Sequence, residues 1–231
     1  MCRIPEGLDG RRRTIRGVNT TIVFVAAAAV LAAVDWWAVA VRNRRLEYVA
    51  KPAAMAMLVV VAAVAGDAPT DVRTWLVIGA AFGLVGDIAL LPEGETTFVV
   101  GLGAFAIGHI AYVVAALLVG FDPVWAIPGA IFVAGLLGFR FLTRIVPGAR
   151  RHGGPVLAGA VVFYAIVISA MVFTSWASAA WIAAVGAMLF AASDWVLGYQ
   201  RFVGPLPGRR LSVIVPYHVG QALLILGLAT A

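Results

Sequence analysis

Eight long runs of apolar residues, separated by short polar or turn-rich stretches, make up most of this 231-residue chain. The apolar positions within each run do not alternate as in a barrel strand, and each run is long enough to cross a bilayer as a helix. Because a helix satisfies its own backbone hydrogen bonds in lipid, the pattern predicts an all-α membrane protein. The expected spans are 20–41, 48–65, 75–91, 98–119, 124–142, 155–174, 177–199 and 211–230.

Composition agrees with this pattern. Hydrophobic residues make up 63% of the chain and charged residues only 12%, with a mean hydropathy of +1.00. A soluble domain carries about 25% charged residues, so the composition excludes an ordinary soluble fold. We therefore expect a polar, basic N-terminal tail, 1–19, and one membrane domain, 20–231, whose eight transmembrane helices form a single bundle.

Positive charge is distributed unevenly between the two sides of the predicted bundle. Of the 17 lysines and arginines, 11 lie in the first, third, fifth and seventh loops. Lysine and arginine favour the cytoplasmic side, so both termini are expected outside the cell membrane and these odd-numbered loops in the cytoplasm. The run Arg11-Arg12-Arg13 favours the opposite orientation. The net charge of +6 indicates attraction to anionic lipid head groups and not nucleic-acid binding.

Four acid or base side chains lie inside the apolar runs. Asp87 and Asp194 are near the ends of the third and seventh spans, and His109 and His218 lie in the spans that follow. An ionisable group at membrane depth costs about 3 kcal/mol or more, so it usually serves a function. Lys51 opens the second span on the same side. Because all these groups are nearer the odd loops, we expect one pocket that opens to the cytoplasmic side.

The spacing of the same groups suggests an internal repeat. Asp87 precedes His109 by 22 residues, and Asp194 precedes His218 by 24. Each aspartate also precedes a leucine by three positions. The pattern favours two parallel four-helix repeats, with chance similarity as the alternative.

Each polar group also has a purely structural interpretation. The two aspartates could bond the backbone of a neighbouring helix, His109 could be a neutral core histidine, and His218 could cap irregular backbone after Pro216. Lys51 could extend to the lipid head groups, as long basic side chains near span ends do. Asp35 stands beside two tryptophans and is typical of the membrane interface.

A set of residues in a defined order carries a family resemblance. The set comprises Lys51-Pro52, Gly86-Asp87-x-x-Leu90, Gly101-x3-Phe105-x3-His109-x2-Tyr112, Pro155 with Tyr164, Ser193-Asp194 and Tyr217-x3-Gln221. In order, spacing and span count it resembles the YhhN family, the lysoplasmalogenase-like group of eight-span membrane proteins, over about residues 20–230. The resemblance implies hydrolysis of the vinyl ether bond of a lysoplasmalogen. The products would be a fatty aldehyde and glycerophospho-ethanolamine or -choline.

The resemblance also implies roles for individual residues. Asp87 and Asp194 match the acidic positions of the family and are the expected catalytic pair. The expected substrate-binding or supporting residues are Lys51, His109, Tyr112, Tyr164, Ser193, Tyr217, His218 and Gln221. At His218 the family pattern has an aromatic residue, so this histidine is a departure. Lys51 is expected to meet the lipid phosphate.

This chemistry needs two carboxyl groups and no cofactor. A vinyl ether hydrolyses after a proton is delivered to its β-carbon, which leaves an oxocarbenium ion that water attacks. Glycosidases use one carboxylic acid to donate the proton and a second carboxylate to guide water or stabilise the cation. We expect Asp87 and Asp194 to divide these two roles, without an assignment of which is the acid.

Two other classes of function are compatible with the same residues. One is a metal-dependent intramembrane lipid hydrolase, in which His109, His218, Asp87 and Asp194 hold Zn²⁺. The other is a non-enzymatic, proton-coupled carrier, in which buried carboxyl and imidazole groups relay protons. A pocket open to one side favours the enzyme, and a path through both faces favours the carrier.

Overall fold

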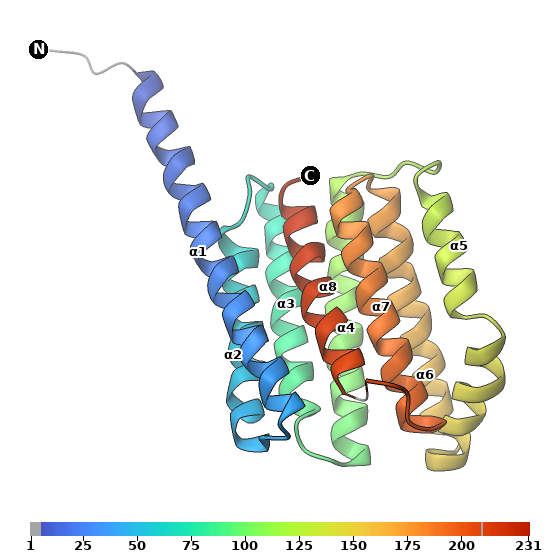
Figure 1. The fold of residues 1–231 in the computed structure, drawn as a ribbon. Helices are drawn as coiled ribbons and strands as arrows, with labels where there is room; N and C mark the ends of the chain where they lie inside the picture. The colour runs from blue at the N-terminus through green and yellow to red at the C-terminus, as the bar shows by residue number, and fades with distance from the viewer. Residues whose placement is uncertain (1–5, 209) are drawn as a thin grey trace, which may run out of the picture.

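A computed structural model describes residues 6–208 and 210–231, with side chains from residue 20 onwards except at 209. In this part of the chain the regular elements are helices, which run alternately in opposite directions in one bundle (Figure 1). The helices are α1 (Glu6–Ala40), α2 (Arg44–Val64), α3 (Thr70–Ala89), α4 (Glu95–Val119), α5 (Ala126–Leu136), the π-helix η1 (Phe141–Ile145), α6 (Val146–Ala177), α7 (Trp181–Phe202) and α8 (Leu211–Ala229).

Seven stretches of the described residues are long and apolar enough to cross a membrane. Six of them lie in α1, α2, α3, α4, α7 and α8, and the seventh is the continuous stretch Ala126–Ala177. The predicted fifth span, 124–142, contains α5, which has only 11 residues, whereas a crossing helix needs about 20. The all-helical membrane architecture is therefore confirmed. Seven stretches of the described residues qualify as spans by length and composition, and the count of eight crossings stays a prediction.

The helix α6 is divided by a break at Gly153-Gly154. Gly154 has φ 71° and ψ −166°, a left-handed region that favours glycine, and Pro155 follows directly. The chain before the break, including η1, lies at the same end of the bundle as the α3–α4 and α7–α8 loops (Figure 1). The membrane-crossing part of α6 thus begins at Pro155, where the sequence predicted the sixth span.

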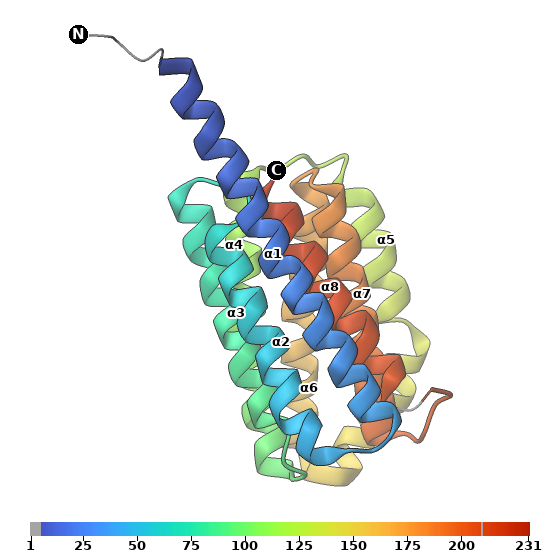
Figure 2. The ribbon, with the colours of Figure 1, turned by 60° about the vertical axis from the view of Figure 1, so that its left-hand side comes forward.

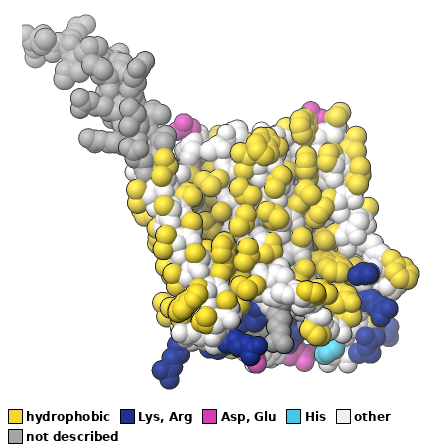
Figure 3. Space-filling view, in the orientation of Figure 1, with side chains coloured by type: hydrophobic (Ala, Val, Ile, Leu, Met, Phe, Trp, Pro, Cys, Tyr) yellow, Lys and Arg dark blue, Asp and Glu magenta, His cyan; other side chains and the backbone are white. Residues whose placement is uncertain are grey.

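Charge separates the two ends of the bundle. Figure 3 shows lysines and arginines gathered at one end, below a broad apolar band. This end is formed by the α1–α2, α3–α4, α5–α6 and α7–α8 loops, and we refer to it as the odd-loop end. The C-terminus and the beginning of α1 lie at the opposite end (Figure 1). The structure therefore agrees with the predicted alternation of loops.

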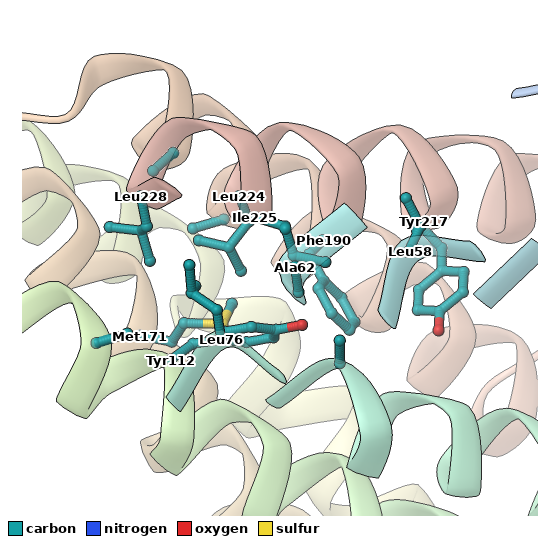
Figure 4. Close-up of a cluster of buried hydrophobic side chains, with 14 of the residues drawn as sticks. Leu58, Ala62, Leu76, Tyr112, Met171, Phe190, Tyr217, Leu224, Ile225 and Leu228 are labelled. Atoms are coloured by element: carbon teal, nitrogen blue, oxygen red, sulfur yellow. The ribbon is translucent and has the colours of Figure 1, made fainter. Parts of the chain in front are cut away.

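The hydrophobic core has a larger cluster, which extends through the half of the bundle away from the odd-loop end, and a smaller one at the odd-loop end that includes Phe98, Phe141 and Phe202. Leu76, Met171 and Leu224 come from α3, α6 and α8 and are fully buried in the larger cluster (Figure 4). Close helix packing supports this core: a Cβ atom on Gly186 of α7 would lie 2.4 Å from the backbone nitrogen of Leu224. Small residues permit such approaches between membrane helices. The larger cluster leaves the space for a pocket nearer the odd loops.

Candidate active site

A pocket lies at the odd-loop end, between helices α2–α8 and η1. It encloses about 880 Å³ of empty space, part of it open to the surroundings. Most of its wall is apolar. The lining residues with an ionisable or hydroxyl group are Lys51, Asp87, Tyr164, Asp194 and Tyr217.

Asp87 forms an ion pair in this wall. It lies near the end of α3, and its side chain is 1% exposed. One carboxylate oxygen, Oδ1, is 3.0 Å from Lys51 Nζ of α2. The other, Oδ2, accepts a hydrogen bond of 2.8 Å from the Tyr217 hydroxyl of α8. Both oxygens are therefore satisfied, and the contact with a buried ammonium group supports an ionised carboxylate.

Asp194 has different partners. It lies near the end of α7, and its Oδ2 accepts a hydrogen bond from the Tyr164 hydroxyl of α6. Its Oδ1 is 3.4 Å from the Ser193 hydroxyl, which bonds more closely to the carbonyl of Phe190, at 2.8 Å. The ion pairs among the described residues do not include Asp194. Its surroundings thus provide hydroxyl groups where those of Asp87 provide a cation.

His109 is connected to the pocket through Tyr164. Its Nε2 lies 2.9 Å from the Tyr164 hydroxyl, so Asp194, Tyr164 and His109 form a continuous hydrogen-bonded chain. The imidazole is 1% exposed and is enclosed by aromatic rings, with the Phe190 ring centroid 4.7 Å away. His109 does not itself line the pocket. It contacts the pocket wall through its hydrogen bond with Tyr164.

Tyr112 and Gln221 lie deeper in the bundle. The Tyr112 hydroxyl donates a 2.9 Å hydrogen bond to Gln221 Oε1 and so joins α4 to α8. Gly79 of α3 makes room for the tyrosine ring, because a Cβ atom there would lie 2.5 Å from it. Neither Tyr112 nor Gln221 lines the pocket. The geometry of this pair is that of an interhelical brace.

His218 faces another part of the bundle. Its Nδ1 accepts a 3.1 Å hydrogen bond from Trp36 Nε1 of α1. It lines a separate hollow and does not line the pocket that contains the aspartates. In the described part of the chain, no three His, Cys, Asp or Glu side chains gather as a metal site requires. The four predicted Zn²⁺ ligands, which included His218, therefore do not lie together in the structure.

The sequence interpretation missed a charged cluster beside the pocket. Glu47 of α2 is 1% exposed and pairs with Arg210, which precedes α8, and with Arg44 at 3.3 Å. The signal available in the sequence was the position of Glu47, four residues before Lys51 and hence on the same helix face. Asp35, interpreted as interfacial, is 0% exposed. Both carboxyl groups are buried near the odd-loop end.

Comparisons with known proteins extend these observations. Lysoplasmalogenase TMEM86B of Homo sapiens is 32% identical over 142 residues, which cover 62% of this chain and 58% of the human protein. The Mus musculus protein of the same name is 33% identical over 161 residues, covering 69% of this chain and 66% of the mouse protein. The matches thus span about three fifths of the length of these relatives.

No solved structure matches the chain. The family model described as the YhhN family matches residues 46–228, which include helices α3–α7, nearly all of α2 and α8, and every ionisable or hydroxyl-bearing residue of the pocket wall. The match covers well over half of the sequence and agrees with the resemblance carried by its ordered motifs. The chain therefore belongs to the YhhN family.

Proposed function

We propose that the chain is an integral membrane hydrolase that cleaves the vinyl ether bond of a lysoplasmalogen, lysoplasmenyl-ethanolamine or -choline. The relatives named lysoplasmalogenase suggest the class of reaction. The observation that carries the proposal is the presence of two buried carboxyl groups with contrasting partners in one apolar pocket. Vinyl ether hydrolysis requires a proton donor and an anionic group.

Asp194 is the proposed general acid. It lies in an apolar wall and is bonded to hydroxyl groups, an environment in which a carboxylic acid can hold its proton. The proton is transferred from Asp194 to the β-carbon of the vinyl ether, and the double-bond electrons form the new C–H bond. The α-carbon and the ether oxygen then share the positive charge of an oxocarbenium ion.

Asp87 is the proposed anionic partner. Its ion pair with Lys51 supports a negative charge on the carboxylate throughout the reaction. The carboxylate stabilises the cation and accepts a hydrogen bond from the attacking water, as the second carboxylate of a glycosidase does. The sequence-based prediction assigned the lipid phosphate to Lys51. The ion pair adds a second proposed role, which is to hold Asp87 ionised and in place.

The remaining steps consume one water molecule. Water adds to the α-carbon and loses a proton, which returns the acid to Asp194. The resulting hemiacetal collapses with transfer of its hydroxyl proton to the glycerol oxygen, which releases the aldehyde and the glycerophospho-base. Tyr164 can donate to Asp194 or accept from it, because its hydroxyl also contacts His109. This hydroxyl therefore accommodates both protonation states of Asp194.

The apolar wall suits a single aliphatic chain. Leu102, Phe105, Val161 and Ile168 line the pocket on the side away from the loops. A lysolipid bound there would place its head group at the odd-loop end, where the arginines gather (Figure 3). The ether bond, between the head group and the chain, would then lie at the level of the two aspartates.

A direct assay tests the proposed reaction. Purified protein is incubated with a lysoplasmalogen or with an ester-linked lysophospholipid, and released aldehyde and free fatty acid are measured. We expect aldehyde from the first lipid, no fatty acid from the second, and activity that survives chelators. Fatty acid release would indicate an ester hydrolase instead. Proton flux in vesicles without release of either product would favour the carrier.

We also propose that the odd-loop end faces the cytoplasm of the cell. In a variant with Cys2 replaced by serine, Arg150→Cys would carry the single thiol on an exposed position of this end. We expect a membrane-impermeant thiol reagent to label it only after the cells are opened. Labelling of intact cells from outside would place the pocket mouth on the outer side.

The finer architecture is a further part of the proposal. Residues 124–142 would complete an eighth crossing, and α1–α4 and α5–α8 would be two related four-helix units. Asp87 and Asp194 support this relation, because each lies near the odd-loop end of the third helix of its unit. Glycine contacts support it as well: Gly108 approaches the Gly79 carbonyl between α3 and α4, and Gly186 approaches Gly220 between α7 and α8.

A further inference from the structure

A second hollow, which we call the alanine groove, lies between α1, α2 and α8. It encloses about 590 Å³, part of it open to the surroundings. Figure 2 shows α1 and α8 side by side along this face of the bundle. The small residues in its wall are Ala28, Ala29 and Ala32 of α1, Ala54 of α2 and Ala222 of α8. Two residues with polar atoms, Trp36 and His218, complete one end of it.

The hydrogen bond between Trp36 and His218 determines where the imidazole carries its hydrogen. An indole N–H can only donate, so His218 Nδ1 must be the accepting, unprotonated nitrogen. The ring is therefore neutral, and its one N–H is at Nε2. Among the described residues nothing accepts a hydrogen bond from this Nε2, although His218 is only 3% exposed. Leaving a buried donor without an acceptor is destabilising, and a ligand oxygen would supply the missing acceptor.

The groove has a direction that matches a lipid chain. Trp36 lies four residues before the end of α1 and His218 in the second turn of α8, so both are near the odd-loop end. Ala28 and Ala222 lie farther toward the middle of the bundle. An occupant would place its hydrogen-bond acceptor beside His218 and its apolar part toward the bilayer centre. Because the residues that line the groove carry no ionised group, the occupant would be uncharged.

We propose that the alanine groove binds the long-chain fatty aldehyde that the proposed reaction releases, with the aldehyde oxygen accepting a hydrogen bond from His218 Nε2. The source of the aldehyde rests on the proposed function. The groove and the pocket are lined by neighbouring residues of the same helices: Tyr217, next to His218 on α8, lines the pocket, and Lys51, another pocket residue, lies three residues before Ala54 on α2. The product therefore has a neutral, apolar site directly beside the place where it forms.

The groove also contains a residue that departs from the family pattern. Helix α1, which supplies Trp36 and three of the alanines, precedes the family match at 46–228. His218 stands where the family resemblance led us to expect an aromatic residue. His218 and Trp36 meet in one hydrogen bond, at 3.1 Å. This coincidence supports a function for the groove that is separate from the two-carboxylate chemistry.

Nitrogen NMR of the histidine rings tests the proposal. The chain has three histidines, so ¹⁵N-histidine labelling of the protein in lipid nanodiscs gives few signals, and His218→Phe identifies those of His218. We expect a protonated Nε2 and an unprotonated Nδ1. Titration with hexadecanal should shift the Nε2 signal to saturation. Hexadecane has no hydrogen-bond acceptor. It should therefore reach the same occupancy only at about tenfold higher concentration, the factor contributed by one hydrogen bond.

A matched pair of variants on α1 provides the control. Ala29→Leu places extra volume in the groove wall and should weaken hexadecanal binding at least about tenfold, because overpacking a site opposes occupancy. Ala26→Leu makes the same change at an exposed position that does not line the groove, and binding should be unchanged. A protonated Nδ1, equal responses to hexadecanal and hexadecane, or binding unaffected by Ala29→Leu would each overturn the proposal.

The outcome is distinguishable from that of the enzyme assay. Saturable hexadecanal binding in a protein that releases no aldehyde from lysoplasmalogen would support the groove as a carbonyl-lipid site and remove the proposed function. Aldehyde release without a response at His218 would support the function and remove the groove.

Discussion

The two aspartates occupy similar local sequences and different surroundings. Asp87 stands in Gly-Asp-Ile-Ala-Leu near the end of α3, and Asp194 in Ser-Asp-Trp-Val-Leu near the end of α7. Asp87 is held by the ammonium group of Lys51 and the hydroxyl of Tyr217. Asp194 is held by hydroxyl groups, and its main partner, Tyr164, leads on to His109. The neighbouring helices, and not the local sequence, therefore give Asp87 an ion pair and Asp194 only hydroxyl partners.

In the proposed mechanism, this difference gives the two aspartates different roles. A carboxylate in a buried ion pair resists protonation, because the paired cation would be left without its counter-ion. A carboxyl group among hydroxyls has no such constraint and can gain or lose a proton. Substitutions at the two aspartates and at the residues that hold them test this contrast.

The largest expected effect is on turnover. Asp194→Asn and Asp87→Asn should each lower aldehyde release by ~10²–10⁴-fold, the usual contribution of a general acid or base. Asparagine keeps the shape but neither donates the proton nor carries the charge. Release from a vinyl ether lipid should be measured per folded protein, with insertion and monodispersity checked by gel filtration. Near-normal turnover of either variant would disprove the two-carboxylate mechanism, and recovery on adding Zn²⁺ would support the metal-dependent alternative.

The second effect concerns stability and separates the two aspartates. Asp87→Asn leaves the buried Lys51 ammonium without its partner and should lower the free energy of unfolding by about 3–5 kcal/mol. Asp194→Asn removes no counter-ion and should cost only about 1 kcal/mol, the value of one hydrogen bond. Denaturation in detergent micelles measures both. The contrast predicts that adding Lys51→Met to Asp87→Asn restores most of the loss, and equal losses in the two single variants would contradict it.

A third, smaller effect tests the hydrogen bonds that connect Asp194 through Tyr164 to His109. Tyr164→Phe should lower turnover by about tenfold, because it removes the hydroxyl that links the two side chains. His109→Gln should lower turnover in the wild-type background and have little further effect in Tyr164→Phe. A double-mutant cycle on kcat measures this coupling. If the two losses simply add, His109 acts independently of Tyr164.

The smallest effect is expected at the deeper brace. Tyr112→Phe removes the hydrogen bond to Gln221 and should lower the free energy of unfolding by about 1 kcal/mol. Turnover should stay within about twofold of wild type, because neither residue lines the pocket. Kinetics and unfolding of the same sample make the comparison. A large loss of turnover with unchanged stability would instead place Tyr112 at the reacting lipid.

The extent of the helices could largely be predicted from the sequence. Apolar length and turn residues are local properties, so the predicted sixth span began at Pro155, where the membrane-crossing part of α6 begins. The fifth predicted span, 124–142, is less regular: only 11 of its residues form the helix α5. Hydropathy reports affinity for lipid, and it does not report where the backbone turns within an apolar stretch.

The sequence by itself also determined that ionisable groups are concentrated toward one end of the bundle, because depth follows from position along each span. Which groups meet was decided only by the tertiary structure. Lys51 reaches Asp87, His218 turns to Trp36, and Glu47 pairs with Arg210. Such contacts depend on the rotation of each helix about its axis and on the identity of its neighbours. Those features arise from packing between residues far apart in the chain, where a single sequence carries little signal.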